Sequence, residues 1–158
     1  MDSLQSIATK LRFEIVKMSH QAKAAHLASS LSCVDIITVL YERILDMDNN
    51  NPGSPDRDRF ILSKGHAASA LYAILAHKGV IDKSMLQTYG RRGSYLEEHP
   101  SPMLTGIEAA TGSLGHGLPI GNGIALSARI LDKQYRVFVL MSDGECNEGS
   151  VWEAAMFA

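Results

Sequence analysis

The sequence lacks any long hydrophobic run and any excess of one charge. No stretch of about 18 apolar residues occurs, so no segment is predicted to span a membrane. The 158 residues carry 15 Lys and Arg against 17 Asp and Glu, a formal net charge of −2. No basic stripe stands out, which removes the electrostatic basis for binding nucleic acid.

Cysteine is also scarce, with only Cys33 and Cys146. Two cysteines cannot form the disulfide framework of a small secreted domain, and free thiols are typical of a reducing cytosol. The N-terminus shows no basic segment followed by an apolar run, so no signal peptide is predicted. With 46% hydrophobic residues, the chain has the composition of a cytoplasmic globular protein of one domain.

The periodicity of the apolar residues predicts helices that alternate with buried strands, which is typical of an α/β fold with a mainly parallel sheet. The strand at 136–141 is apolar on both faces, as in a central parallel strand. We expect helices over 3–18, about 35–45, 67–78, 82–90, 121–131 and after 145, strands at 60–62 and 136–141, a loop with a short helical turn at 20–32, a turn-rich connector at 48–55, and a long loop at 91–119.

The last eight residues have an apolar helical pattern that no Gly, Pro or basic turn ends. Domains rarely end inside such a helix, so we interpret the end as a truncation or a split between chains. Val151, Trp152, Met156 and Phe157 are expected to be exposed there, as an apolar patch for a partner.

A turn of Asp143, Gly144 and Glu145 directly follows the strand at 136–141. Ligands of open α/β sheets bind beyond the carboxyl ends of the strands. Asp143 is a hard oxygen ligand for Mg²⁺ or Ca²⁺, and Gly144 lets a diphosphate approach the backbone. The next helix begins nearby, and its N-terminus favours an anion. A plain strand-to-helix turn is the alternative.

Four of the six histidines lie among small or turn-forming residues, where they can reach a ligand and move protons near neutral pH. They are His26, His66, His99 and His116. No pair has the spacing of a zinc site. Taken singly, each is more readily explained as a solvated or structural histidine.

The segment Thr111–Gly117 (TGSLGHG) brings three glycines close together, which lets the backbone approach a ligand. It is not a P-loop, because no Gly-Lys-Ser/Thr follows. A tight loop before a closely packed helix is the alternative. No nucleophile elbow or serine or cysteine triad is apparent.

In order along the chain, these segments resemble the transketolase family. The resemblance covers almost all 158 residues and rests on five motifs: Asp58–Ala68 (DRFILSKGHAA), Gly93-Ser94 with His99-Pro100, Gly106-Ile107-Glu108, Thr111–Gly115, and Asp143-Gly144-Glu145 with Glu148-Gly149. It implies a three-layer thiamine-diphosphate-binding fold that is incomplete at its C-terminus, with residues 1–158 as the N-terminal part of the diphosphate-binding domain.

The resemblance also implies a role for each matching residue. Asp143 would bind the divalent cation, and Gly144, Glu145 and His66 would lie at the diphosphate. Catalytic contacts to the ketose donor would come from His26 and His99. The middle of the cofactor would lie along Gly112, Ser113, Leu114 and Gly115, and Glu148 would lie at the subunit interface. The family reaction transfers a two-carbon ketol unit between sugar phosphates.

Three positions depart from the family pattern. Ser142 stands where Gly-Asp-Gly is usual, Glu98 precedes His99 in place of Gly, and His116 replaces the more usual Gln. The Asn-Asn pair that ends the cofactor motif and the pyrimidine-binding domain are absent. A C-terminal transketolase subunit would have to supply that domain within a homo- or hetero-oligomer. The alternatives are a non-catalytic remnant that binds a partner and another thiamine diphosphate enzyme, such as deoxyxylulose-phosphate synthase.

Overall fold

A computed structural model describes residues 2–48 and 51–158 of the chain, and it confirms the α/β fold. Two of the connector residues expected at 48–55, positions 49 and 50, lie outside the described part. The elements are α1 (Leu4–Ala22), α2 (Leu27–Leu31), α3 (Val34–Val39), a π-helix (Leu40–Ile44), β1 (Arg59–Leu62), the 3₁₀ helix η2 (Gly65–Ala67), α4 (Ala68–His77), a 3₁₀ helix (Lys83–Thr88), α5 (Gly117–Ile130), β2 (Val137–Leu140), the 3₁₀ helix η4 (Gly144–Asn147) and α6 (Gly149–Phe157).

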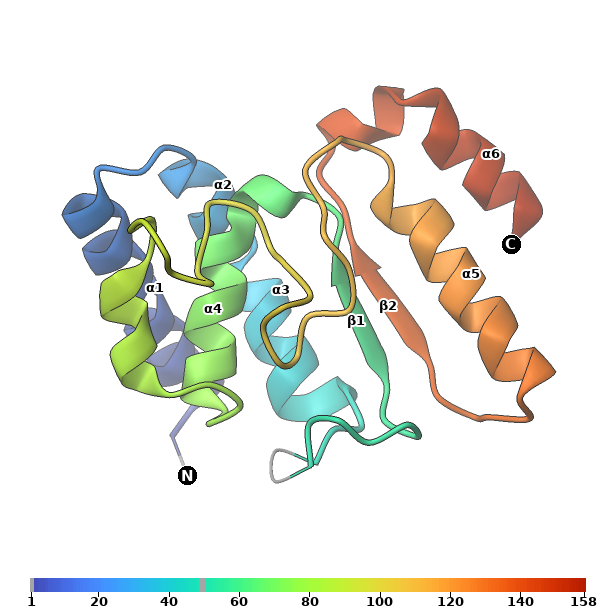
Figure 1. Cartoon of the computed structure of the whole chain (residues 1–158), viewed down its shortest axis with the longest axis horizontal. Helices are drawn as coiled ribbons and strands as arrows, with labels where there is room; N and C mark the ends of the chain where they lie inside the picture. The colour runs from blue at the N-terminus through green and yellow to red at the C-terminus, as the bar shows by residue number, and fades with distance from the viewer. Residues whose placement is uncertain (1, 49–50) are drawn as a thin grey trace.

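The two strands pair in parallel, with Arg59 opposite Val137 and Leu62 opposite Leu140. Helices α1 to α4 lie on one side of this sheet and α5 on the other, which gives three layers (Figure 1). Successive residues of a strand point to opposite faces. Phe60 and Leu62 therefore join the core formed with α1, α3 and α4, whereas Ile61 lies near Gly121 of α5.

The main core lies under α4, a helix that is buried all round. Every residue from Ala68 to Ala76 is buried, and a helix that is apolar on all sides belongs in an interior. The apolar stripe of α1 packs against it through Ile7, Leu11, Ile15 and Met18. Ser3 caps α1 by accepting a hydrogen bond from the Ser6 amide at 3.1 Å.

Several expected elements differ in detail. Helix α1 runs four residues beyond 18, and α2 is the short turn expected within 20–32. The expected helix at about 35–45 ends as a π-helix, and the one at 82–90 is a 3₁₀ helix over Lys83–Thr88. Strand β2 is only half-buried along its length. The expectation of a central strand is wrong for the described residues, because β2 pairs only with β1, although Phe138 and Leu140 pack on the core and Val137 and Val139 lie against α5.

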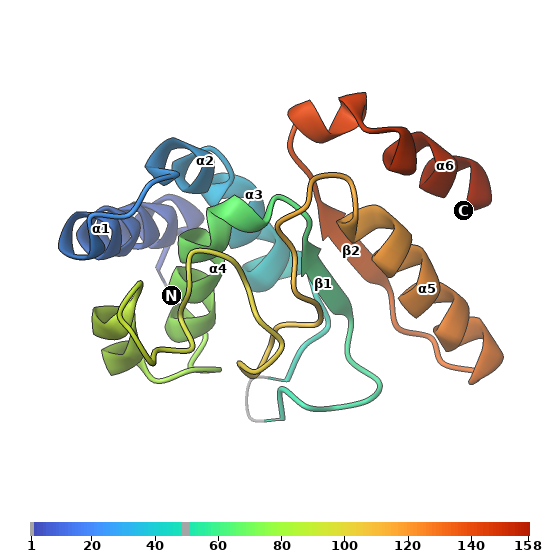
Figure 2. The same ribbon diagram turned by 45° about the horizontal axis from the view of Figure 1, so that its top comes forward.

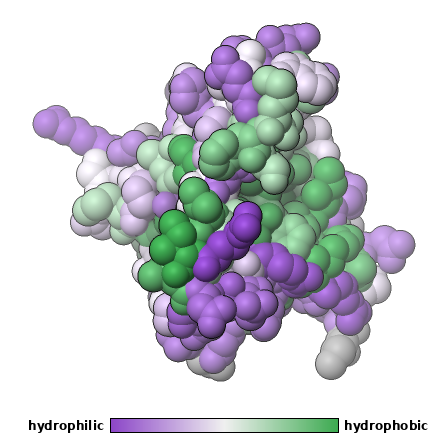
Figure 3. Space-filling model, turned by 90° about the vertical axis from the view of Figure 1, so that its right-hand side faces the viewer, coloured by the Kyte–Doolittle hydropathy of each residue, from purple (hydrophilic) through white to green (hydrophobic). Residues whose placement is uncertain are grey.

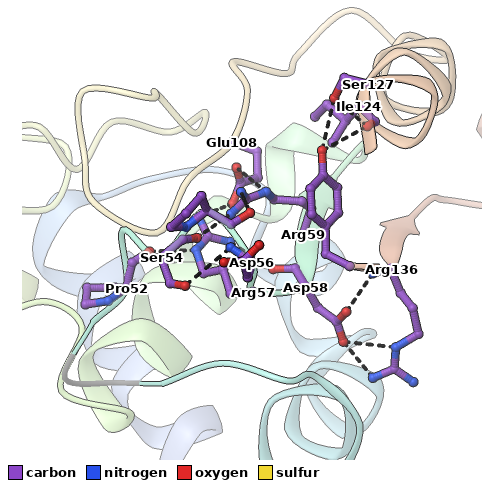
Figure 4. A network of polar contacts seen from close by, with 12 residues as sticks. Pro52, Ser54, Asp56, Arg57, Asp58, Arg59, Glu108, Ile124, Ser127 and Arg136 are labelled. Carbon is purple, nitrogen blue, oxygen red and sulfur yellow. Dashed lines mark hydrogen bonds and ion pairs between the residues drawn. The ribbon is translucent and has the colours of Figure 1, made fainter. Parts of the chain in front are cut away.

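A network of ion pairs closes the amino ends of the strands (Figure 4). The buried Asp58 carboxylate accepts hydrogen bonds from the Arg136 guanidinium at 2.6 and 3.1 Å and from the Arg136 backbone amide at 2.7 Å. Arg57 pairs with Glu108 nearby, and the Arg59 guanidinium stacks over the Tyr135 ring. This network joins β1 to β2 at the end of the sheet opposite the predicted site.

Helices α5 and α6 leave an apolar face exposed, part of which is visible in Figure 3. Trp152 is 60% exposed, Met156 82% and Phe157 68%, as expected. The expectation for Val151 is wrong, because α6 packs against α5 and Val151 is 6% exposed. In the described part of the chain, no helix is both long enough and apolar enough to cross a membrane.

Candidate functional site

The carboxyl ends of β1 and β2 meet at one edge of the sheet, as they must in a parallel pair. Strand β1 leads through Ser63 and Lys64 into η2, and β2 leads through Ser142 and Asp143 into η4. Figure 2 shows the loop before α5 crossing this edge beside η4. Most of the predicted site residues follow one of these strand ends or lie on this loop.

Three histidines predicted separately from the sequence lie together. The ring of His26 is 5.4 Å from that of His66 and 6.3 Å from that of His99, measured between centroids. His26 has a positive φ of 65° at the start of α2, a strained conformation for a non-glycine residue. Lys23 and Asp132 also have a positive φ, so it is the neighbourhood of His26 and not its conformation that associates it with the site. His26 and His99 are exposed, and His66 is half-buried.

The histidines share this edge with a buried cation. Lys64 is 7% exposed and donates a hydrogen bond to the Ser32 hydroxyl at 3.0 Å. Burial of the ring lowers the pKa of His66 below 6.5, and the charges of Lys64 and His26 lower it further. The Glu145 carboxylate acts in the opposite direction. Burial and the nearby positive charges therefore favour the neutral form of His66.

The glycine loop, residues 112–117, packs closely against this cluster. A Cβ built on Gly112 would lie 3.2 Å from Cδ2 of His99. Gly115 has a φ of +79°, and a Cβ there would lie 2.7 Å from Cβ of Glu148. A side chain at Gly115 would therefore be strained and crowded. Ser113 and Leu114 are exposed on the same loop.

Asp143 and Gly144 lie at the end of β2 and are both exposed. Nothing lies within 4 Å of a Cβ built on Gly144, so a ligand has room to approach the backbone there. Among residues 2–48 and 51–158, no three His, Cys, Asp or Glu side chains form a ready metal site.

Glu145 differs from its neighbours because its side chain is fully buried, at 0% exposed. One oxygen accepts hydrogen bonds from the Ser63 hydroxyl and, at 3.0 Å, from the Gly115 amide. The other accepts from the Ser142 amide at 2.7 Å. This carboxylate has no exposed oxygen for a direct contact with a ligand.

The family described as "Transketolase, thiamine diphosphate binding domain" matches residues 3–158. The chain belongs to the transketolase family. One relative is a subunit of the apulose-4-phosphate transketolase of Phocaeicola vulgatus, with 42% identity over 156 residues that cover 99% of this chain and 56% of that protein. Human transketolase-like protein 2 is 43% identical, covering 98% of this chain and 25% of that protein.

Solved transketolases have the same fold. The structure from Leishmania mexicana superposes with a TM-score of 0.93 at 26% identity, covering 100% of this chain and 25% of that one. The structure from Campylobacter jejuni gives 0.92 at 31% identity, covering 100% of this chain and 26% of that one. The chain thus spans about half the length of the apulose-4-phosphate relative and about a quarter of these transketolases.

Within this transketolase domain, the serine that departs from the Gly-Asp-Gly pattern bonds inward. The Ser142 hydroxyl lies 3.2 Å from the Glu145 carboxylate, to which it donates. Two further serine and threonine hydroxyls, those of Ser63 and Thr111, had no predicted role. Thr111 donates to the Leu62 carbonyl at 2.6 Å, which fixes the start of the glycine loop to the end of β1. In the sequence, only their position inside the family motifs could have indicated a role for Ser63 and Thr111.

The edge that carries the predicted site residues is largely exposed. A hollow of about 610 Å³ lies elsewhere, between α1, α4 and the 3₁₀ helix Lys83–Thr88, and none of the predicted site residues lines it. The backbone of His99 is held by α4, because the Tyr72 hydroxyl donates a hydrogen bond to the His99 carbonyl oxygen at 3.1 Å. His26, His99, Ser113, Leu114 and Asp143 are all exposed at this edge.

Proposed function

We propose that this chain is the diphosphate-binding component of a transketolase, which transfers a two-carbon ketol unit from a ketose phosphate to an aldose phosphate. The supporting observation is the meeting of His26, His66 and His99 with the glycine loop at the carboxyl ends of two parallel strands. When bound, thiamine diphosphate supplies the carbanion chemistry that breaks and forms the carbon–carbon bond.

The residues present suit a diphosphate and a divalent cation. Lys64 gives this edge a fixed positive charge, and Gly144 leaves space beside its backbone. Asp143 would hold Mg²⁺ or Ca²⁺, and His66 would lie at the diphosphate. Gly112, Ser113, Leu114 and Gly115 would follow the middle of the cofactor. We assign Glu145 to support of this site instead of direct contact, because both its oxygens are buried and hydrogen-bonded.

His26 and His99 would act on the sugar. Both are exposed beside the half-buried His66, so a ketose bound at this edge can reach their ring nitrogens. Each ring can donate a hydrogen bond to a hydroxyl and hold its proton as the carbon–carbon bond breaks. Glu98 beside His99 would influence the choice of the donor sugar.

We further propose that a C-terminal transketolase subunit completes the site within a homo- or hetero-oligomer. The names of two relatives support this, since each denotes a subunit. One belongs to the apulose-4-phosphate transketolase, and the other, SqwG, to the 6-deoxy-6-sulfo-D-fructose transketolase of a Clostridium species. Glu148 beside Gly115 would face the partner. Both described cysteines are free thiols, which suits a cytoplasmic location.

Calorimetric titration of thiamine diphosphate with Mg²⁺ tests the proposal. The titration is run on the purified chain and then on the chain mixed with a candidate C-terminal transketolase subunit. We expect binding only in the mixture, because most of the predicted contacts are exposed in the chain alone. No binding in either sample would favour a non-catalytic remnant that keeps the residue types of the site without their function.

Replacing His99 with Ala should lower turnover about 100-fold while leaving the affinity for thiamine diphosphate within about twofold. Loss of a positioned proton donor costs roughly 10²–10⁴ in rate, whereas the diphosphate contacts lie on other residues. Steady-state kinetics and calorimetry on the assembled enzyme measure the two quantities. His20→Ala, at an exposed position on the last turn of α1, is the matched control. Loss of cofactor binding in His99→Ala would reassign His99 to the cofactor.

A further inference from the structure

One buried carboxylate connects the three segments that carry the predicted cofactor-binding residues. Glu145 accepts from Ser63 at the end of β1, from Gly115 in the glycine loop and from Ser142 at the end of β2. The bonds from Ser63 and Gly115 join η4 to the end of β1 and to the glycine loop, and the bond from Ser142 closes the turn into η4. A single side chain therefore links both strand ends and the loop that crosses them.

The connection continues from Ser63 into α5. The Ser63 side chain is fully buried, and its oxygen accepts a hydrogen bond from the Gly117 amide at 3.1 Å. Gly117 is the first residue of α5, so its amide would otherwise have no partner within the helix. A chain of hydrogen bonds therefore runs from the start of α5 through Ser63 to Glu145.

Close packing leaves these segments little freedom to shift. A Cβ built on Gly117 would lie 2.7 Å from Cα of Ser63, a distance that real side chains do not show. The Ser150 hydroxyl donates to the Gly115 carbonyl at 3.0 Å, which ties the same loop to α6. The loop can change its position only if several hydrogen bonds break together.

The donors around Glu145 come from separate segments. The Ser63 hydroxyl, the Gly115 amide and the amide and hydroxyl of Ser142 surround its two oxygens.

We propose that Glu145, acting with Ser63, is a positioning residue that fixes the glycine loop and the Asp143-Gly144 turn relative to each other before the cofactor binds. The role rests on the proposed function, because it is cofactor binding that makes the spacing of these segments matter. Glu145 itself touches neither cofactor nor sugar. Its effect is that the binding edge is ordered in advance, so that the cofactor does not have to order it.

Amide hydrogen exchange on the chain without cofactor gives the first test. In Glu145→Gln, an NH₂ group replaces an accepting oxygen, and in Ser63→Ala the hydroxyl is absent. We expect exchange at the amides of Gly115, Gly117 or Ser142 to accelerate about tenfold or more in both variants. The amides of α4 should be unchanged. Glu153→Gln, at an exposed position of α6, also removes one negative charge. It should change the exchange rates neither of the loop amides nor of the α4 amides.

Cofactor titration and kinetics of the assembled enzyme give the second test. We expect both variants to bind thiamine diphosphate about tenfold more weakly, with kcat at saturating cofactor within about twofold of the parent. Faster exchange throughout α4 would overturn the proposal in favour of general stabilisation. Lower kcat at unchanged affinity would overturn it in favour of direct contact with the reacting groups.

The two tests also separate this proposal from the proposed function. Unchanged cofactor affinity in both variants, in an assembly whose parent does bind, would overturn only the positioning role of Glu145. Failure of the parent assembly to bind any cofactor would overturn the proposed function itself, and the positioning role with it. Ser63→Ala removes one hydroxyl without changing charge, so it remains informative if Glu145→Gln does not fold.

Discussion

Asp143→Ala should abolish detectable Mg²⁺-dependent binding of thiamine diphosphate to the assembled enzyme, whereas the chain itself remains folded. The carboxylate is the proposed cation ligand, and without it the diphosphate and the cation lose a shared anchor. A charged contact of this kind is worth roughly 3 kcal/mol, more than a hundredfold in affinity. Because Asp143 is exposed, we expect the free energy of unfolding to change by less than about 0.5 kcal/mol.

Calorimetry with Mg²⁺, with Ca²⁺ and without a divalent cation measures this effect. The parent should require a cation, and Asp143→Ala should bind weakly in all three conditions. Glu153→Ala removes an exposed carboxylate from the neighbouring helix α6 and serves as the matched control. Unchanged affinity in Asp143→Ala would remove the central assignment of the site.

Asp58→Ala should have the largest effect on stability, a loss of about 3 kcal/mol in the free energy of unfolding. The Asp58 side chain is 4% exposed. It accepts from the backbone amides of Asp46 at 2.9 Å and Arg136 at 2.7 Å as well as from the Arg136 guanidinium. Alanine would leave two backbone donors without their partner next to the paired strands.

Chemical denaturation compares this variant with Asp56→Ala. Asp56 forms an ion pair with Lys133 at 2.6 Å, but its side chain is 65% exposed, so that loss should stay below about 1 kcal/mol. Equal losses in the two variants would show that the buried Asp58 contacts contribute no more to the free energy of unfolding than an exposed ion pair does. Asp56 and Asp58 lie two positions apart on the connector before β1. The comparison therefore separates the effect of burial from the effect of location in the chain.

The pH dependence of stability provides a second readout for Asp58. Burial raises its pKa, but the hydrogen bonds from Arg136 and Asp46 outweigh burial, and the net pKa lies below 3.8. The stabilising contribution is therefore complete above about 3.8, the unfolded value, and is lost as the pH falls through the lower folded value. Asp58→Ala should lack this part of the acid dependence, while Asp56→Ala should retain it.

The order of the elements and the edge where the site lies follow from the amino-acid sequence alone. Apolar periodicity placed α1, α4, α5 and both strands close to their observed positions, because these patterns depend on local burial. The Asp143-Gly144 turn lies at the carboxyl end of β2 because it directly follows that strand in the sequence. Ordered motifs then identified the family, which the comparison over residues 3–158 confirms.

Local pattern did not determine the finer elements. The helix expected at 82–90 is a 3₁₀ helix, and the one at about 35–45 ends as a π-helix. Both share the composition of an α-helix; the 3₁₀ helix packs against α1 and α4, and the π-helix directly continues α3, so tertiary context overrides local propensity. The half-buried β2 likewise carries the sequence of a central strand, although in the described part of the chain it pairs with β1 alone.

Which polar residues meet depends on the packing of distant segments. His26, His66 and His99 lie on three separate segments, and nothing in their spacing gives the 5.4 and 6.3 Å between their rings. Glu145 looked like its exposed neighbours Asp143 and Gly144, yet its side chain turns inward to Ser63 and Gly115. The direction of a side chain after a turn depends on donors brought from elsewhere in the chain, and a local sequence pattern does not contain that information.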